Sequence, residues 1–75
     1  MITILDIGTG CADIPISIIR WARKKDYQVR IFALDSNYKT LKLAKNLTKS
    51  YPEIQLIAGD ALHLPFKNGI FDYVI

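Results

Sequence analysis

The sequence predicts an α/β fold built on a parallel sheet. Three short apolar runs, Ile2–Ile7, 29–34 and Ile54–Ala58, have the composition of strands buried on both faces. Stretches whose apolar residues recur at helical spacing separate these runs. Strands that alternate with helices in this way usually pair in parallel, so we expect a single sheet with helices packed on it.

The first helix is expected between the first two strands. Asp13 offers an N-cap, and Pro15 suits the first turn. The positive charges of Lys24 and Lys25 complement the carboxyl end, where the helix should stop. The face toward the sheet should consist of Ile14, Ile18, Ile19 and Ala22.

The second helix should begin at a cap supplied by Ser36 or Asn37 and stop at Pro52. After the third strand, a loop that contains Pro65 and an Asn68-Gly69 turn leads to a fourth strand at 71–75. The apolar face of the second helix would comprise Leu41, Ala44, Leu47 and Tyr51.

Right-handed crossovers fix how these elements are arranged. They give the strand order 3-2-1-4 and place both helices on the same face of the sheet. The loop at 60–71 is too short to cover the other face with a substantial helix, although a parallel sheet needs cover on both faces. We therefore expect residues 1–75 to be a partial domain, the first half of a larger doubly wound one. A missing carboxyl-terminal half or a partner chain would complete it, and the isolated polypeptide should be molten, aggregated or partnered.

Composition and charge narrow the class of protein. Of the 75 residues, 51% are hydrophobic and 23% are charged, which is typical of a globular chain rather than a disordered one. No apolar run approaches the roughly 20 residues that span a bilayer, so no membrane is expected as a partner. The single cysteine, Cys11, fits a reducing compartment, and we expect a cytoplasmic protein. The net charge of +3 rests largely on lysines at helical spacing, which indicates a solvated helix face but leaves nucleic acid open as a partner.

The segment 5–15 carries the first functional signal, because a strand runs through a glycine turn directly into a helix. Gly8 and Gly10 allow a sharp turn and let a ligand lie against the peptide groups. A dinucleotide pyrophosphate is disfavoured, since Asp6 and Asp13 flank the turn and Asp13 occupies the third glycine position of the GxGxxG pattern. The same carboxylates would accept a ligand that carries an ammonium or sulfonium group.

Acidic residues end the first three predicted strands, namely Asp6, Asp35 and Asp60. Adjacent parallel strands bring their carboxyl ends to one edge, where ligands bind in doubly wound sheets. Asp35 lies 25 residues beyond Gly10, close to the spacing of about 20 expected for a carboxylate that binds ribose hydroxyls. In the alternative interpretation, these acids only cap the helices that follow, but the coincidence of three acids with a glycine turn disfavours it. A nucleoside ligand is indicated.

Four segments, in order along the chain, resemble the class I S-adenosylmethionine-dependent methyltransferases. Leu5-Asp6-Ile7-Gly8-Thr9-Gly10 resembles the first motif of that family and Ala33-Leu34-Asp35 the second. Residues 59–66 resemble the third motif, and 71–75 resemble the opening of the fourth. The resemblance spans the whole chain and departs at Ala12, where many members have a third glycine. It implies a Rossmann-like, mostly parallel sheet and S-adenosyl-L-methionine as the cofactor.

The resemblance also implies which residues would bind this cofactor. Asp6, Gly8 and Gly10 would line its methionine part, Asp35 would accept the ribose hydroxyls, and Asp60 would face the adenine amine. The methyl group would pass in line to a small-molecule acceptor. No catalytic base and no metal ligand is assigned in this chain, and His63 is not expected to act as a base. The full set expected at the cofactor is Asp6, Gly8, Thr9, Gly10, Asp13, Asp35, Ser36, Asp60, Ala61 and Leu62.

Two other functions stay open at this point. An NAD(P)-dependent oxidoreductase would use the same fold, although Gly59-Asp60 is not part of the dinucleotide fingerprint. A non-catalytic, truncated methyltransferase-like module would instead bind a partner chain through its open sheet face.

Overall fold

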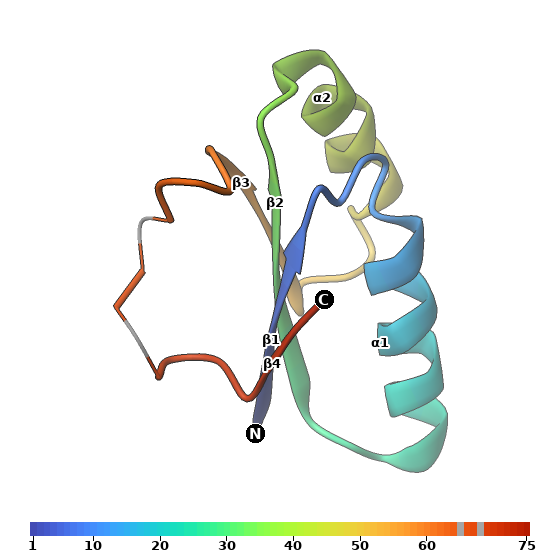
Figure 1. The fold of residues 1–75 in the computed structure, drawn as a ribbon. Coiled ribbons are helices and arrows are strands. Elements are labelled where there is room, and N and C mark those ends of the chain that lie inside the picture. The colour runs from blue at the N-terminus through green and yellow to red at the C-terminus, as the bar shows by residue number, and fades with distance from the viewer. Residues whose placement is uncertain (65, 68) are drawn as a thin grey trace.

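The computed structural model describes residues 1–64, 66–67 and 69–75, and the expectations for Pro65 and Asn68 lie outside these residues. Strands and helices alternate along most of the chain (Figure 1). In chain order the elements are β1 (Ile2–Ile7), α1 (Asp13–Lys25), β2 (Val29–Asp35), α2 (Tyr38–Leu47), β3 (Ile54–Ala58) and β4 (Tyr73–Val74).

The four strands form one parallel sheet in the order β3-β2-β1-β4, which confirms the predicted topology. The register aligns the strand ends, since Asp6 pairs with Ala33 on β2, and Asp35 pairs with Ala58 on β3. The expected fourth strand at 71–75 is too long, because β4 comprises Tyr73–Val74 and pairs only with Ile4 and Leu5 of β1. In the part of the chain that is described, β4 has a neighbour on one side alone, so fewer hydrogen bonds hold it.

Both helices cover the same face of the sheet, as expected (Figure 1). Between this face and the helices lies a core of buried side chains, which comprises Ile4, Ile19, Ala22, Val29, Ile31, Ala33 and Ile54. Two residues of the predicted helix faces are exposed rather than buried against the sheet. Ile14 is 56% exposed, and Leu47 is 50% exposed.

The two corrections have different causes. The side of α1 against the sheet is centred on Pro15, Ile19 and Ala22, so Ile14 lies beyond the contact. In α2 the helix ends at Leu47 rather than continuing to Pro52. The residue that turns inward there is Thr48, whose hydroxyl donates a hydrogen bond to the Ala44 carbonyl at 2.9 Å.

The caps of the two helices differ. Asp13 is not the N-cap of α1, as the sequence suggested, but its first helical residue. The N-cap is Ala12, which has a left-handed backbone (φ 65°) and makes no side-chain capping bond, because the glycine loop sets its conformation. The cap of α2 is Asn37, whose side-chain oxygen accepts hydrogen bonds from the backbone N–H groups of Lys39 and Thr40.

The face of the sheet opposite the helices is crossed by the segment between β3 and β4 (Figure 1). Phe66 and Phe71 from this segment meet Phe32 of β2 edge to face, with ring centroids 4.9–5.7 Å apart. Several apolar side chains here remain exposed, among them Leu62, Leu64, Ile70 and Val74. Among the residues that the structure describes, no helix covers this face, in agreement with the expectation.

Candidate functional site

The glycine loop after β1 is fixed to the carboxyl end of β2. The backbone N–H groups of Gly8 and Thr9 both donate to the Leu34 carbonyl, at 2.8 and 2.9 Å. The Gly10 N–H donates to Asp35 Oδ2 at 2.8 Å. These three bonds hold the loop in one place before any ligand arrives, which is the preorganisation that a binding site needs.

Gly8 and Gly10 both have positive φ angles, of 71° and 60°. Residues that carry a side chain rarely adopt such backbone angles, so the turn favours glycine at both positions. A Cβ atom built on either residue would meet nothing within 4 Å. The space beside these two Cα atoms is therefore open, and a ligand could lie there against the loop.

Asp35 connects three segments at this edge. Its Oδ2 accepts from the Gly10 N–H, and its Oδ1 accepts from the Asn37 N–H at 2.8 Å. The Asp35 carbonyl accepts from the Gly59 N–H at 3.1 Å, which brings the end of β3 alongside. Each carboxylate oxygen can accept more than one hydrogen bond, so the side chain retains capacity for hydroxyl groups of a ligand.

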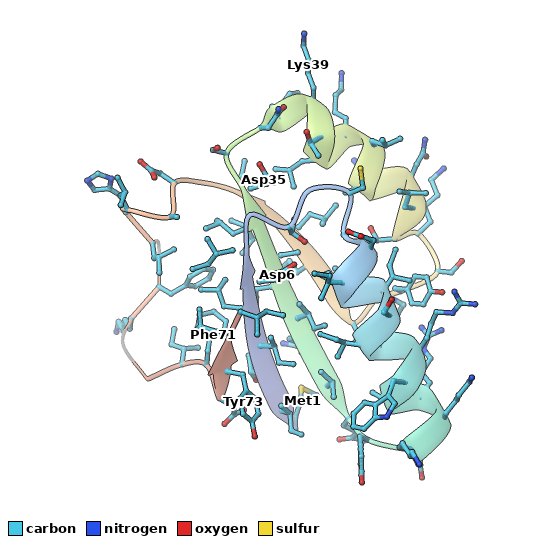
Figure 2. All side chains as sticks on the ribbon, turned by 45° about the vertical axis from the view of Figure 1, so that its right-hand side comes forward. Met1, Asp6, Asp35, Lys39, Phe71 and Tyr73 are labelled. Atoms are coloured by element: carbon cyan, nitrogen blue, oxygen red, sulfur yellow. The ribbon has the colours of Figure 1, made fainter. Side chains whose placement is uncertain are left out.

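Asp6 is buried at the end of β1, with 5% of its surface exposed, and Figure 2 shows it below Asp35. Burial raises the pKa of the Asp6 carboxyl above its ordinary value, and the carboxylates of Asp13 and Asp35 add to this rise. The Thr9 side chain lies close enough to offset part of the rise in pKa. The Asp6 region therefore concentrates negative charge in a poorly solvated place.

Thr9 itself is 5% exposed. Its hydroxyl oxygen has no hydrogen-bond partner among the described residues, although its backbone is fixed to Leu34. The sequence placed Thr9 at the site without giving its side chain a role.

Asp60 differs from the other two acids, because its carboxylate is exposed and folds back on its own turn. Its Oδ1 accepts from the Leu62 N–H at 2.9 Å, and its Oδ2 lies 3.3 Å from His63 Nδ1. Ala61 and Leu62 line a cleft of about 400 Å³ on the face opposite the helices, together with Phe66 and Phe71. The structure thus brings Asp6 and Asp35 together at the glycine loop, and it places the Asp60 turn beside them through the Gly59 bond.

Two other predicted residues also lie at this edge. Asp13 is exposed in the first turn of α1, and Ser36 is exposed between β2 and the Asn37 cap. The structure adds a contact that the sequence did not reveal. A Cβ atom on Gly59 would come within 2.8 Å of Leu34 Cδ1, so glycine lets β3 end close against β2.

None of the helices in the described residues is both long enough and apolar enough to cross a bilayer. Within the same residues, no three His, Cys, Asp or Glu side chains gather as metal ligands would.

Known proteins resemble this chain over nearly its whole length. A family model described as a methyltransferase domain matches residues 4–75. Two curated relatives are described as demethylmenaquinone methyltransferases: that of Staphylococcus saprophyticus is 36% identical over 70 residues, and that of Bacillus licheniformis is 38% identical over 72. The matches cover 93% and 96% of this chain but 29% and 30% of the relatives. The chain thus spans less than a third of their length.

Solved structures share the fold at lower identity. The cyclase SpnF matches with a TM-score of 0.84 and 18% identity, over 97% of this chain and 26% of its own. A SAM-dependent methyltransferase from Aquifex aeolicus matches with a TM-score of 0.81 and 16% identity. The match covers 97% of this chain and 38% of that methyltransferase. PKMT2 from Rickettsia typhi, solved in complex with AdoHcy, matches with a TM-score of 0.75 and 23% identity. The match covers 97% of this chain and 14% of PKMT2.

Proposed function

Because this chain belongs to the methyltransferase-domain family, we propose that it binds S-adenosylmethionine and takes part in transferring the methyl group of that cofactor. The family expected from the four sequence motifs is thereby confirmed. The observation that carries the proposal is the anchored glycine loop, which has open space beside Gly8 and Gly10 and is bonded to the Asp35 carboxylate. The buried Asp6 carboxyl lies at the end of the strand that leads into this loop.

The proposed cofactor contacts follow from these positions. Asp6 would hold the ammonium group of the methionine part, and Gly8, Thr9 and Gly10 would lie under it. Asp35 would accept the ribose hydroxyls with its remaining lone pairs, with Ser36 beside it. Asp13 would add negative charge near the sulfonium.

The adenine ring would lie toward the Asp60 turn. Ala61 and Leu62 line the cleft there, and the aromatic rings of Phe66 and Phe71 supply apolar walls. Asp60 would accept a hydrogen bond from the exocyclic amine. Its Oδ1 accepts from the Leu62 N–H and its Oδ2 lies 3.3 Å from His63 Nδ1, but a carboxylate oxygen can accept more than one hydrogen bond, so capacity for the amine remains.

The charge of the site favours this cofactor over a dinucleotide. Asp6, Asp13 and Asp35 would repel a pyrophosphate, whereas they would stabilise an ammonium and a sulfonium. The burial of Asp6 strengthens this preference, because charges interact more strongly where water is scarce. An NAD(P)-dependent oxidoreductase is the less suitable candidate.

When bound, S-adenosylmethionine supplies an electrophilic methyl group on a positively charged sulfur. This chain's residues would orient it, so that an acceptor could attack the methyl group in line while the bond to sulfur breaks. The acceptor would be a small molecule, and demethylmenaquinone is the first to test because the curated relatives are named for it. Further residues, from a longer protein or a partner chain, would shape the acceptor pocket and cover the open face.

Calorimetric titration with S-adenosylhomocysteine and with NADH tests the proposal. We expect micromolar binding of the first and none of the second, and the reverse result would contradict it. The cyclase SpnF shares the fold, so binding alone does not establish methyl transfer. Transfer of a labelled methyl group to demethylmenaquinone distinguishes a methyltransferase from a module that only binds the cofactor.

A further inference from the structure

The outer edge of β3 is a surface that the proposed cofactor site does not use. The sheet order places β3 at one end, so in the part of the chain that is described no strand pairs with this edge. The Gly59 N–H, just after β3, donates to the Asp35 carbonyl of β2. Backbone groups along a strand alternate in direction, so the N–H and C=O groups of Leu56 and Ala58 point away from β2. An added strand can pair with these groups.

A groove runs along this edge, between β3 and α2. It consists of two hollows of about 220 and 540 Å³, which share Lys45 and Leu56 and are therefore continuous. None of the residues that line them belongs to the set proposed to bind the cofactor. The groove is lined from β3 by Leu56 and Ala58, and from α2 and the turn after it by Tyr38, Lys42, Lys45 and Lys49.

The wall that α2 contributes to this groove is positively charged. Lys42, Lys45 and Lys49 recur at intervals of three and four residues, which places them in a row on one side of the helix and its last turn. All three side chains are exposed. Tyr38 continues the row, and the Lys42 Nζ lies 5.6 Å from the centre of its ring. Residues 36–52 contain no Asp or Glu, so no acidic side chain of this segment neutralises the lysine row.

We propose that this groove is a docking site for an acidic peptide segment in an extended conformation, which adds a strand to the outer edge of β3. Main-chain hydrogen bonds to Leu56 and Ala58 hold the peptide whatever its sequence. Side chains alternate between the two faces of a strand, so every second residue of the peptide faces α2. Acidic residues at those positions meet the lysine row, which selects for them by charge.

The shape and charge of the groove favour this occupant over others. A second copy of the chain, paired β3 to β3 about an axis perpendicular to the sheet, would bring its own lysine row beside this one, and like charges repel. A bilayer or a nucleic acid would attract the lysines, but neither carries the alternating N–H and C=O groups that complete a strand edge. Lysines beside an edge strand also oppose self-association, so the row protects the edge while its partner is absent.

The first test measures binding of a short fluorescent peptide of alternating glutamate and valine by fluorescence anisotropy. Lys42→Gln combined with Lys45→Gln should weaken binding about tenfold, because two ion pairs in the groove are lost. Lys24→Gln combined with Lys25→Gln is the matched control, since it removes the same charge from the end of α1, outside the groove. The control should change binding by less than about twofold, because salt screens distant charges. All four lysines are exposed, so both variants should keep the fold.

The second test concerns the strand edge itself and needs no variant of the protein. A peptide that carries N-methyl groups on alternate residues keeps its charge but loses the N–H donors along one edge. It should bind at least about tenfold more weakly, because several main-chain hydrogen bonds are lost. Binding of the unmodified peptide should also slow hydrogen exchange at the Leu56 and Ala58 amides.

Several results would overturn the inference. The peptide fails to bind, it binds the two doubly substituted proteins equally well, or the N-methylated peptide binds as tightly as the unmodified one. Stronger binding of phosphatidylglycerol vesicles or duplex DNA at the lysine row would assign this surface to a membrane or a nucleic acid. A dimer that the peptide dissociates would assign it to a second copy of the chain.

The docking inference and the proposed function fail separately. The Lys42→Gln, Lys45→Gln protein should bind S-adenosylhomocysteine as the unsubstituted protein does, because the groove shares no lining residue with the cofactor site. Loss of peptide binding with S-adenosylhomocysteine binding intact therefore counts against the docking site alone.

Discussion

Two loops meet at the carboxyl edge of the sheet, and they are built in opposite ways. The loop at 8–12 is tied to β2 by backbone bonds to Leu34 and by the Asp35 side chain, and it contains the buried residues Thr9 and Ala12. The turn at 60–63 is exposed, and the side-chain bonds of Asp60 stay within the turn. One side of the candidate site is thus part of the core, and the other rests on the surface.

The difference indicates how the site would work. A loop anchored in the core holds its ligand groups at fixed positions and lowers the entropy lost on binding. A surface turn with few buried contacts opens at low free-energy cost, so it can adjust to a ligand or to further chain packed against it. We expect the methionine and ribose contacts to be preformed and the adenine contacts to become ordered on binding.

The largest predicted effect compares two leucines, one from each side. Leu34 is 1% exposed and its side chain packs against Gly59, so Leu34→Ala should lower the free energy of unfolding by about 3 kcal/mol through the cavity it leaves. Leu62 is 85% exposed, and Leu62→Ala should change the free energy of unfolding by less than about 0.5 kcal/mol. Urea unfolding measures both. Equal losses would show that the two sides are not built differently.

A second comparison concerns the two acids that would bind the nucleoside. Asp35→Ala should weaken S-adenosylhomocysteine binding by about 2 kcal/mol, roughly 30-fold, because it removes both the ribose acceptor and the anchor of Gly10. Asp60→Ala should weaken the binding free energy of S-adenosylhomocysteine by less than about 1 kcal/mol. The Asp60 carboxylate is exposed, and the adenine would keep its backbone and apolar contacts. Calorimetry on both variants decides the point, and a larger loss at Asp60 would reverse the assignment.

The third prediction concerns the pH dependence of stability at Asp6. Because burial raises the pKa of Asp6, the folded state holds a proton that the unfolded state has already released. The unfolding free energy should therefore fall as pH rises from the unfolded pKa through the folded one. Asp6→Asn should remove this loss and be the more stable protein at pH 7, with the difference shrinking toward pH 3. Urea unfolding at several pH values tests this, and an Asn variant less stable at pH 7 would contradict it.

The sequence predicted the strands and their order well because each strand is an apolar run, and such runs have few places to be buried. It predicted less well where tertiary contact decides the outcome. Ile14 and Leu47 fit the helical period of their segments, but the sheet covers only part of each apolar stripe. Asp13 has the chemistry of a cap, yet the closure of the glycine loop gives that position to Ala12.

The same distinction applies within the candidate site. Acids at strand ends and glycines in a turn are visible as residue types at a spacing, so Asp6, Asp35, Gly8 and Gly10 could be named from the sequence. The Leu34 carbonyl that holds the loop is a backbone group, and no residue type marks it. That Asp60 bonds within its own turn depends on loop geometry, which the sequence alone does not define.

The smallest predicted effect concerns Ala12, the loop residue that stands where many methyltransferases of this family have a third glycine. Ala12 has a φ of 65°, and a residue with a Cβ in this region costs about 1 kcal/mol relative to glycine. Its methyl group is fully buried, and removing it costs about 0.8 kcal/mol, so Ala12→Gly should change the unfolding free energy by well under about 1 kcal/mol. Gly8→Ala is the matched control, because its φ of 71° carries the same strain while the added Cβ would meet nothing within 4 Å. That variant should lose about 1 kcal/mol from strain alone. If urea unfolding shows no loss of unfolding free energy in Gly8→Ala, the backbone at residue 8 has relaxed to a negative φ. That result would mean that the loop is less firmly held than its bonds to Leu34 and Asp35 imply.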